Sequence, residues 1–189
     1  MFTKPLAFLA LLLATPVMAE GDGPGPNLVI EVSGAANGTV VIDLNIDAAP
    51  KHVAQIVALA QAGAYDNVVF HRVIDGFMAQ TGDVQYGKAG GDTAMAGMGG
   101  SDLPNIEAEF STSLTFARGT VGMARAQDPN SANSQFFIMF APGDFLDGQY
   151  TIIGEVISGM EIVDAITRGE GDNGEVTAPD VMAKVTVTE

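Results

Sequence analysis

Residues 70–80 read Phe70-His71-Arg72-Val73-Ile74-Asp75-Gly76-Phe77-Met78-Ala79-Gln80 and are the most informative stretch of the chain. They set one permanent cation, Arg72, among large apolar side chains, and they end on an amide that both donates and accepts hydrogen bonds. Burial of a guanidinium destabilises the folded protein unless a polar group forms hydrogen bonds or an ion pair with it. Because Asp75-Gly76 is a tight-turn dipeptide, the stretch predicts two strand segments joined by a turn.

A second region combines aromatic side chains with an amide in the same way. It runs through Gln135-Phe136-Phe137 and continues at Phe145-Leu146. Together with residues 70–80, it predicts an apolar pocket that has a cationic donor on its wall. Such a pocket suits a ligand that is apolar and carries a peptide carbonyl. From the residues alone, an ion pair between Arg72 and a carboxylate at the rim of the sheet is an equal alternative.

Many short strands and few helices are expected along the rest of the chain. Pro50 favours a helix that runs to Ala62, and apolar spacing predicts a second short helix over 160–168. Gly87–Gly100 holds six glycines and predicts a long mobile loop. Since strands and helices do not alternate, the pattern predicts an all-β sandwich or barrel with two short helices. Alternating or β-branched residues place the strands at 28–32, 39–45, 68–74, 77–80, 120–124, 135–140, 150–156 and 181–187.

Composition excludes several classes of function. The net charge is −15, from 8 basic and 23 acidic residues, which argues against nucleic-acid binding and against anionic membrane surfaces. The chain has no cysteine, so disulfides, thiolate catalysis and Cys-based zinc sites are excluded. Its two histidines are too few for a His-rich metal site, and no metal is expected. His71 is interpreted as a hydrogen-bonded residue of the core.

Residues 1–19 have the pattern of a cleavable signal peptide. Lys4 supplies the early positive charge, an apolar stretch follows, and Ala19 ends a segment of small or compact residues. The apolar stretch is too short to span a membrane, so the mature protein is expected to be exported and soluble. Residues 20–26 are rich in glycine and proline and are interpreted as a flexible linker, which leaves 27–189 as one domain.

Four motifs occur in order in this domain: Phe70–Asp83, Gly122–Ala126, Asn133–Ile138 and Phe145–Gly148. They resemble those of the cyclophilin-type peptidyl-prolyl cis-trans isomerases. An exported chain with Arg125 and Phe145 is most similar to the bacterial periplasmic branch, which implies a periplasmic location. The resemblance also implies a closed eight-stranded antiparallel β-barrel with a helix over each open end, no cofactor and a monomeric state.

The resemblance implies an activity, rotation about Xaa-Pro bonds in unfolded or exported polypeptides, and a role for each site residue. Arg72 would stabilise the twisted amide by donating to the prolyl nitrogen, which regains a lone pair once resonance is lost. Gln80 would hydrogen-bond the rotating or adjacent carbonyl. The pocket for the proline ring would be formed by Phe77, Met78, Phe137 and Leu146. The flanking peptide backbone would be held by Ala124, Arg125 and Gln135.

The chain departs from the family pattern at four positions. Asp75 stands where proline is usual, and Thr81 where glycine is usual. Phe145 replaces the tryptophan that supports cyclosporin binding in many eukaryotic members, so weak cyclosporin binding is expected. Tyr150 replaces a histidine that often lines the pocket, and its role there is left open.

Two other functions stay open from the sequence. One is a non-catalytic protein that binds proline-containing peptides, or holds unfolded chains, through the same groove. The other is a small-molecule-binding β-barrel, which predicts an interior cavity with Arg72 inside it. Strand alternation raises a further question, because it puts Phe77 and Met78 on opposite faces unless the turn before them twists the strand.

Overall fold

A computed structural model describes residues 23–189. The predicted signal peptide, residues 1–19, and the first part of the predicted linker lie outside this range. The Gly23 N–H donates to Asp43 Oδ2 at 2.9 Å, and the Leu44 N–H donates to Pro26 O at 3.2 Å, so residues 23–26 run beside a strand. No helix of the described part is long and apolar enough to cross a membrane.

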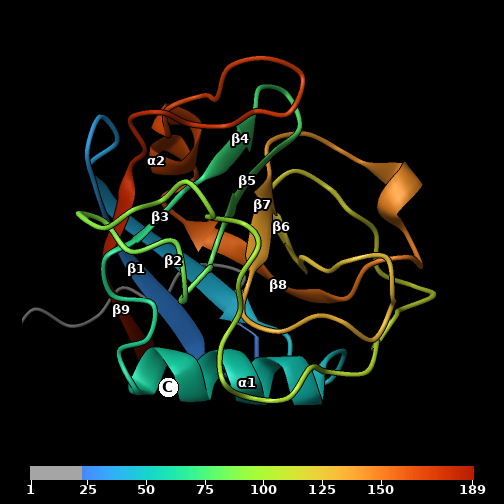
Figure 1. Ribbon diagram of the computed structural model, residues 1–189. Helices are drawn as coiled ribbons and strands as arrows, with labels where there is room; N and C mark the ends of the chain where they lie inside the picture. Colours follow the sequence, from blue (N-terminus) through green and yellow to red (C-terminus); the bar gives the residue numbers. More distant parts are fainter. Residues whose placement is uncertain (1–22) are drawn as a thin grey trace, which may run out of the picture.

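One antiparallel sheet of nine strands forms the body of residues 23–189 (Figure 1). Its strand order is β3-β9-β1-β2-β8-β6-β7-β5-β4. A hairpin joins the first two strands, with Val32 opposite Gly38. The elements in chain order are β1 (Asn27–Ser33), β2 (Gly38–Leu44), α1 (Pro50–Gln61), β3 (Val68–Val69), β4 (Arg72–Ile74), β5 (Met78–Thr81), β6 (Thr120–Met123), β7 (Phe136–Met139), the 3-10 turn η1 (Asp144–Leu146), β8 (Ile152–Ser158), α2 (Met160–Ala165) and β9 (Val181–Thr188).

The sheet does not close into the eight-stranded barrel that the resemblance implied. Its edge strands, β3 and β4, follow each other in the chain with only Phe70 and His71 between them, so the sheet curls until its edges approach. Backbone groups at these edges bond to the C-terminal loop instead of to each other. The Phe70 N–H donates to Asp180 O at 2.9 Å, and the Val73 N–H donates to Gly174 O at 2.7 Å. The sheet is therefore an open, curled half-barrel.

The strand predicted over 68–74 is interrupted, and the interruption decides where Arg72 lies. Phe70 is only 1% exposed and belongs to the main core, whereas Arg72 is half-buried and begins β4. Regular alternation along one strand would put Phe70 and Arg72 on the same face, but here the two side chains lie in different surroundings. A turn over 75–77 returns the chain into β5, and this register puts Arg72 opposite Gln80.

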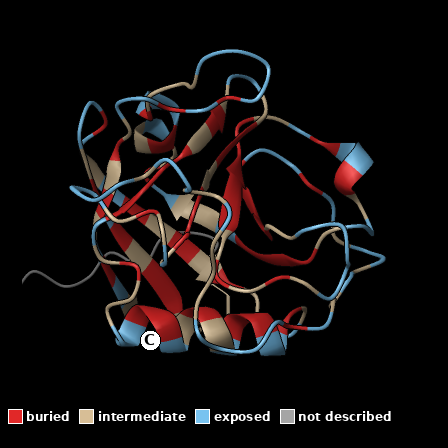
Figure 2. Ribbon diagram, viewed as in Figure 1, coloured by how far each residue is buried: buried red, intermediate tan, exposed pale blue. Residues whose placement is uncertain are grey.

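Many residues of the strands are buried (Figure 2), and the apolar ones among them form the main core. Tyr65 and Phe136 are fully buried there, with their rings packed edge to face. The two helices lie at opposite ends of the sheet (Figure 1), where α1 buries Val53 and Ile56 and α2 buries Val163. This placement of the helices agrees with the one that the resemblance implied.

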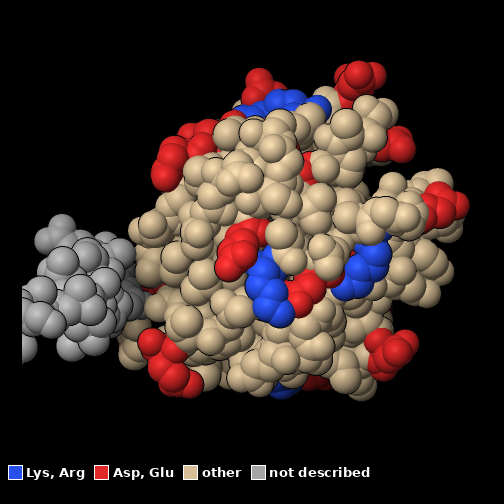
Figure 3. Space-filling view, turned by 90° about the vertical axis from the view of Figure 1, so that its left-hand side faces the viewer, with Lys and Arg blue, Asp and Glu red and all other residues tan. Residues whose placement is uncertain are grey.

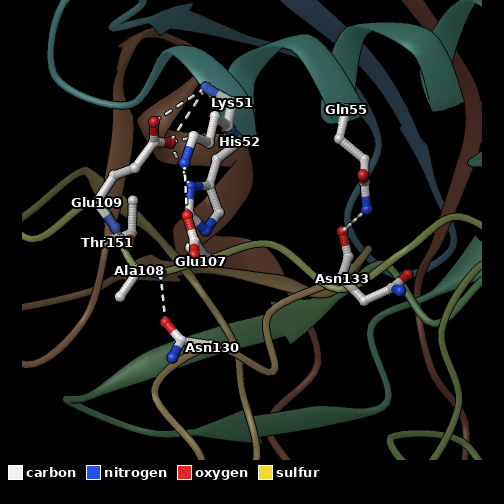
Figure 4. A network of polar contacts seen from close by, with 9 residues as sticks. All are labelled: Lys51, His52, Gln55, Glu107, Ala108, Glu109, Asn130, Asn133 and Thr151. Carbon is white, nitrogen blue, oxygen red and sulfur yellow. Dashed lines mark hydrogen bonds and ion pairs between the residues drawn. The ribbon is translucent and has the colours of Figure 1, made fainter.

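A polar network attaches α1 to neighbouring loops (Figure 4). The helix begins at Pro50 and has no side-chain cap of its own. Glu109 supplies one, because its carboxylate accepts hydrogen bonds from the backbone N–H groups of Lys51 and His52 and lies 2.6 Å from His52 Nδ1. Further along α1, Gln55 Nε2 donates to Asn133 O at 3.0 Å. These contacts hold the loop before β6, through Glu109, and the loop before β7, through Asn133, against α1.

Candidate active site

A hollow of about 420 Å³ opens on the outer surface beside β5 and β7, and we call it the Arg72 groove. It brings together all the predicted site residues except Gln135. Gln135 does not line the groove, but its Oε1 accepts a hydrogen bond from Gln80 Nε2. It also includes Gln149, which sequence reasoning missed. The lining residues are Arg72, Phe77, Met78, Gln80, Ala124, Arg125, Phe137, Phe145, Leu146, Gln149 and Tyr150.

The floor of the groove is apolar and is supported from beneath. The Phe137 ring is 5% exposed and stacks on the buried Phe116 ring, with centroids 5.7 Å apart. Gly122 permits this packing, because a Cβ atom there would come within 2.6 Å of both rings. Phe77 lies in the turn rather than in β5, so strand alternation does not apply to it and it lines the groove together with Met78.

Arg72 has no acidic partner in the described part of the chain. Its Nε donates to Asn173 O at 2.9 Å and its Nη1 to Gln80 Oε1 at 3.3 Å, while its Nη2 donates to no residue within 23–189. Burial lowers the pKa of Arg72 from its ordinary value, but an arginine side chain stays charged at any physiological pH. The groove therefore presents an unused N–H donor on a permanent cation.

The absence of an ion pair is informative because the surface is rich in acids (Figure 3). Four other basic side chains of residues 23–189 do pair with carboxylates, including Arg118 with Asp164 at 2.6 Å and Arg168 with Asp75 at 2.9 Å. The predicted alternative for Arg72, an ion pair at the rim of the sheet, is therefore wrong for the described residues.

Arg125 and Tyr150 form the opposite wall. The Arg125 guanidinium lies over the Tyr150 ring, 4.3 Å from its centroid, and its Nη2 donates to Gln149 O at 2.9 Å. The Tyr150 ring meets the edge of Phe137 with centroids 5.9 Å apart. Gln149 contributes through its backbone carbonyl, which any residue carries, so no side-chain pattern could have revealed it.

His71 is buried as predicted, but the predicted hydrogen bond is not found. Neither ring nitrogen has a partner among the described residues. Gly97 covers the ring, because a Cβ atom at that position would lie 3.1 Å from Nε2. Burial lowers the pKa of His71 from 6.5 to about 4, a shift that the nearby Asp83 opposes only in part.

This depressed pKa predicts a loss of stability in mild acid. The unfolded chain takes up a proton on His71 near pH 6.5, whereas the folded protein does so only near pH 4, so stability falls as the pH drops through this window. Between about pH 7 and pH 4.5, His71 should contribute a loss of about 2 kcal/mol. Urea unfolding at both pH values should show a smaller loss for His71→Gln than for the wild type. Equal losses of unfolding free energy in the wild type and His71→Gln would show that His71 is not the group responsible.

The fold and the groove together define a class of protein. The lining combines an apolar floor, two guanidinium groups and backbone or side-chain amides. Within residues 23–189 it includes no Ser, Cys, His, Asp or Glu side chain to serve as nucleophile or general base. Because Arg72 faces an outer groove and not the interior, the geometry disfavours a small-molecule barrel. Such a site suits a protein that handles an apolar peptide segment without covalent chemistry.

Sequence comparisons identify the family. The family model described as "Cyclophilin type peptidyl-prolyl cis-trans isomerase/CLD" matches residues 28–187. A "Probable peptidyl-prolyl cis-trans isomerase" of Brucella suis biovar 1 is 52% identical over 184 residues, which span 96% of this chain and 92% of the relative. The chain therefore belongs to the cyclophilin-type peptidyl-prolyl cis-trans isomerases, and its enzyme class is that of the family.

Two crystal structures confirm the cyclophilin fold. The cyclophilin AquaCyp293 from Hirschia baltica has a TM-score of 0.70 at 27% identity, covering 85% of this chain and 73% of that protein. A cyclophilin-type isomerase of Cryptosporidium parvum, crystallised in the presence of the dipeptide Ala-Pro, has a TM-score of 0.74 at 26% identity, covering 86% of this chain and 99% of that protein.

Proposed function

We propose that this chain accelerates rotation about Xaa-Pro bonds in exported polypeptides as they fold. Isomerisation of these bonds takes tens to hundreds of seconds without catalysis and limits the folding of many chains. The reaction breaks no bond, so the enzyme must bind the twisted amide better than either planar isomer. The proline ring would lie on the apolar floor that Phe137 and Met78 form.

One observation carries the mechanism: Arg72 is a cation in the groove that has an unused donor and no carboxylate partner within residues 23–189. As the amide twists, its nitrogen regains a lone pair and becomes a hydrogen-bond acceptor. A rigid, always charged guanidinium is suited to donate to that nitrogen. The Cryptosporidium structure with Ala-Pro present supports a proline-containing ligand for the groove of this chain.

The proposed setting is the periplasm, in the bacterial periplasmic branch of the family. The signal-peptide pattern of residues 1–19 supports export, and Arg125 and Phe145 are the residues on which the branch assignment rests. Fractionation of cells that make the full chain tests the location. Recovery of a shortened protein with the periplasmic fraction is expected, and recovery of the full-length chain in the cytoplasm would contradict it.

Refolding of a substrate protein separates the enzyme from a non-catalytic binder of unfolded chains. The test uses a protein whose slow refolding phase is limited by one Xaa-Pro bond. An isomerase shortens this phase at a small fraction of the substrate concentration, whereas a binder needs comparable amounts and changes yield rather than rate. A slow phase that is unchanged at every ratio would refute catalysis on folding chains.

The proposal includes weak cyclosporin binding, and it predicts which substitution strengthens it. Phe145 is 65% exposed at the edge of the groove and packs against Phe77. Phe145→Trp adds apolar area and an indole N–H donor, so cyclosporin affinity measured by calorimetry should rise about tenfold. Phe110→Trp is the matched control, because Phe110 is an exposed phenylalanine outside the groove. Equal affinities for the two variants would refute the role of Phe145.

A further inference from the structure

Asp83 is a fully buried carboxylate outside the Arg72 groove, and within residues 23–189 its carboxylate accepts hydrogen bonds from backbone groups alone. Its Oδ1 accepts hydrogen bonds from the N–H groups of Gln85 and Tyr86, at 3.0 and 2.9 Å. Its Oδ2 accepts hydrogen bonds from the N–H groups of Gly97 and Gly99, at 2.7 and 2.9 Å. These four hydrogen bonds stabilise the buried carboxylate. Gln85 and Tyr86 precede the glycine-rich loop Gly87–Gly100, and Gly97 and Gly99 lie near its end, so Asp83 holds the two ends of this loop together.

The loop can approach Asp83 only because its contact residues are glycines. A Cβ atom on Gly99 would come within 2.6 Å of Asp83 Oδ1 and within 2.8 Å of the Tyr86 ring. Gly97 has a φ of +98°, a left-handed conformation that favours glycine, and it rests on the His71 ring. The segment predicted as a mobile loop therefore has a specific anchor at this end.

The same two glycines determine how Gln135 is oriented. The carbonyls of Gly97 and Gly99 both accept from Gln135 Nε2, at 3.0 and 2.8 Å. Because carbonyl oxygens accept only, the amide of Gln135 must turn its NH₂ group toward the loop and its oxygen toward Gln80. Gln80 Nε2 then donates to Gln135 Oε1 at 2.9 Å, which leaves Gln80 Oε1 to accept from Arg72 Nη1 at 3.3 Å.

These contacts form one directed hydrogen-bond chain from an anion to a cation. It runs from Asp83 through the Gly97–Gly99 backbone, Gln135 and Gln80 to Arg72, and every donor in it has a fixed partner. Chains of this kind polarise each member and hold a single arrangement of amide groups. Asp83 fixes the position of the Gly97–Gly99 backbone, and this backbone fixes the orientation of the Gln135 amide. The Gln135 amide in turn orients Gln80, which holds the Arg72 guanidinium.

We propose that Asp83 is a positioning residue for Arg72, acting through the Gly97–Gly99 backbone and the two glutamines. The inference rests on the proposed function, since it concerns how the guanidinium is held for the twisted amide. It assigns a task to a residue that neither touches the substrate nor lines the groove. If so, the activity depends on the buried charge of Asp83, which anchors the glycine-rich loop.

The test compares Asp83→Asn with Asp180→Asn. In Asp83→Asn one carboxylate oxygen becomes an NH₂ group, which cannot accept from the backbone N–H groups that face it. Asp180 is the matched control, a buried carboxylate that also accepts backbone N–H groups, from Ala36 at 2.8 Å and Thr167 at 2.7 Å, and is not in the chain to Arg72. Both variants should lose stability. Only Asp83→Asn should also lower kcat/KM per folded molecule, by about tenfold, with peptide affinity changed less than about twofold.

A spectroscopic readout keeps the outcome independent of activity. The side-chain NH₂ signals of Gln80 and Gln135 in an amide NMR spectrum should shift or broaden in Asp83→Asn and stay in place in Asp180→Asn. Unshifted signals in folded Asp83→Asn would overturn the proposal, and so would equal loss of kcat/KM in both variants. If the wild type itself fails to accelerate isomerisation, the proposed function is refuted. The NMR spectra still show in that case whether Asp83 orients Gln135 and Gln80.

Gly99→Ala provides a second route if Asp83→Asn does not fold. The added methyl group displaces the loop from the carboxylate and leaves the charge in place. The same shifts of the two glutamine signals and a similar loss of kcat/KM are expected. A folded Gly99→Ala protein with unchanged signals and full activity would overturn the proposal.

Discussion

Replacement of Arg72 by alanine is expected to lower kcat/KM for an Xaa-Pro peptide by about 10²- to 10³-fold. In the proposed mechanism the groove would lose the guanidinium donor that bonds to the prolyl nitrogen, while the apolar floor stays intact. Arg72→Lys should recover little of the loss, because an ammonium group lacks the rigid fork and cannot hold Asn173 O and Gln80 Oε1 together. Peptide isomerisation followed by NMR gives the rates.

Arg125→Ala is the matched control for this experiment. Arg125 is the other guanidinium of the groove, and its donors are already used by backbone carbonyls such as Gln149 O. Arg125→Ala should lower kcat/KM by about tenfold or less, because in the proposed mechanism Arg125 supports the wall of the groove and does not donate to the prolyl nitrogen. A kcat/KM of Arg72→Ala within about threefold of the wild type would refute the mechanism.

Phe137→Ala should produce the largest combined loss of stability and peptide binding. Its ring is almost fully buried between Phe116 and Tyr150, so truncation removes apolar contacts and leaves a cavity. The free energy of unfolding should fall by about 3–5 kcal/mol. Because the ring is also the floor of the groove, the affinity for a proline peptide should fall at least about tenfold.

Phe136→Ala separates the two effects. Phe136 is the neighbouring residue of β7, points into the main core and packs against Tyr65. It should lose a similar amount of stability in urea unfolding, with peptide affinity per folded molecule changed less than about threefold. Equal losses of affinity in the two variants would show that the floor of the groove does not bind the peptide.

Much of the site follows from short-range sequence patterns. The turn at Asp75-Gly76 is brief, so strand pairing across it puts Arg72 opposite Gln80 without any distant contact. Aromatic residues and amides in contiguous motifs on β5 and β7 then meet, because these strands are neighbours in the sheet. This is why the predicted residues Arg72, Phe77, Met78, Gln80 and Phe137 line one groove.

Long-range contacts account for what the sequence patterns did not predict. Closure of the sheet depends on whether its edges bond to each other or to the C-terminal loop, and Phe70 bonds to Asp180 of that loop. The same contact interrupts the strand predicted over 68–74. The anchoring of Gly97 by Asp83 joins residues on either side of a loop that has no periodic pattern. Local propensity carries no information about such pairings.

Exchange NMR on a peptide with one Xaa-Pro bond tests the proposed activity most directly. The uncatalysed bond exchanges over tens to hundreds of seconds, and protein at about one hundredth of the peptide concentration should make exchange at least about 100-fold faster. The same amount of Arg72→Ala should leave the rate near the uncatalysed value. A peptide that binds the wild-type protein but exchanges no faster than in buffer would contradict the account and leave a non-catalytic binder of proline peptides.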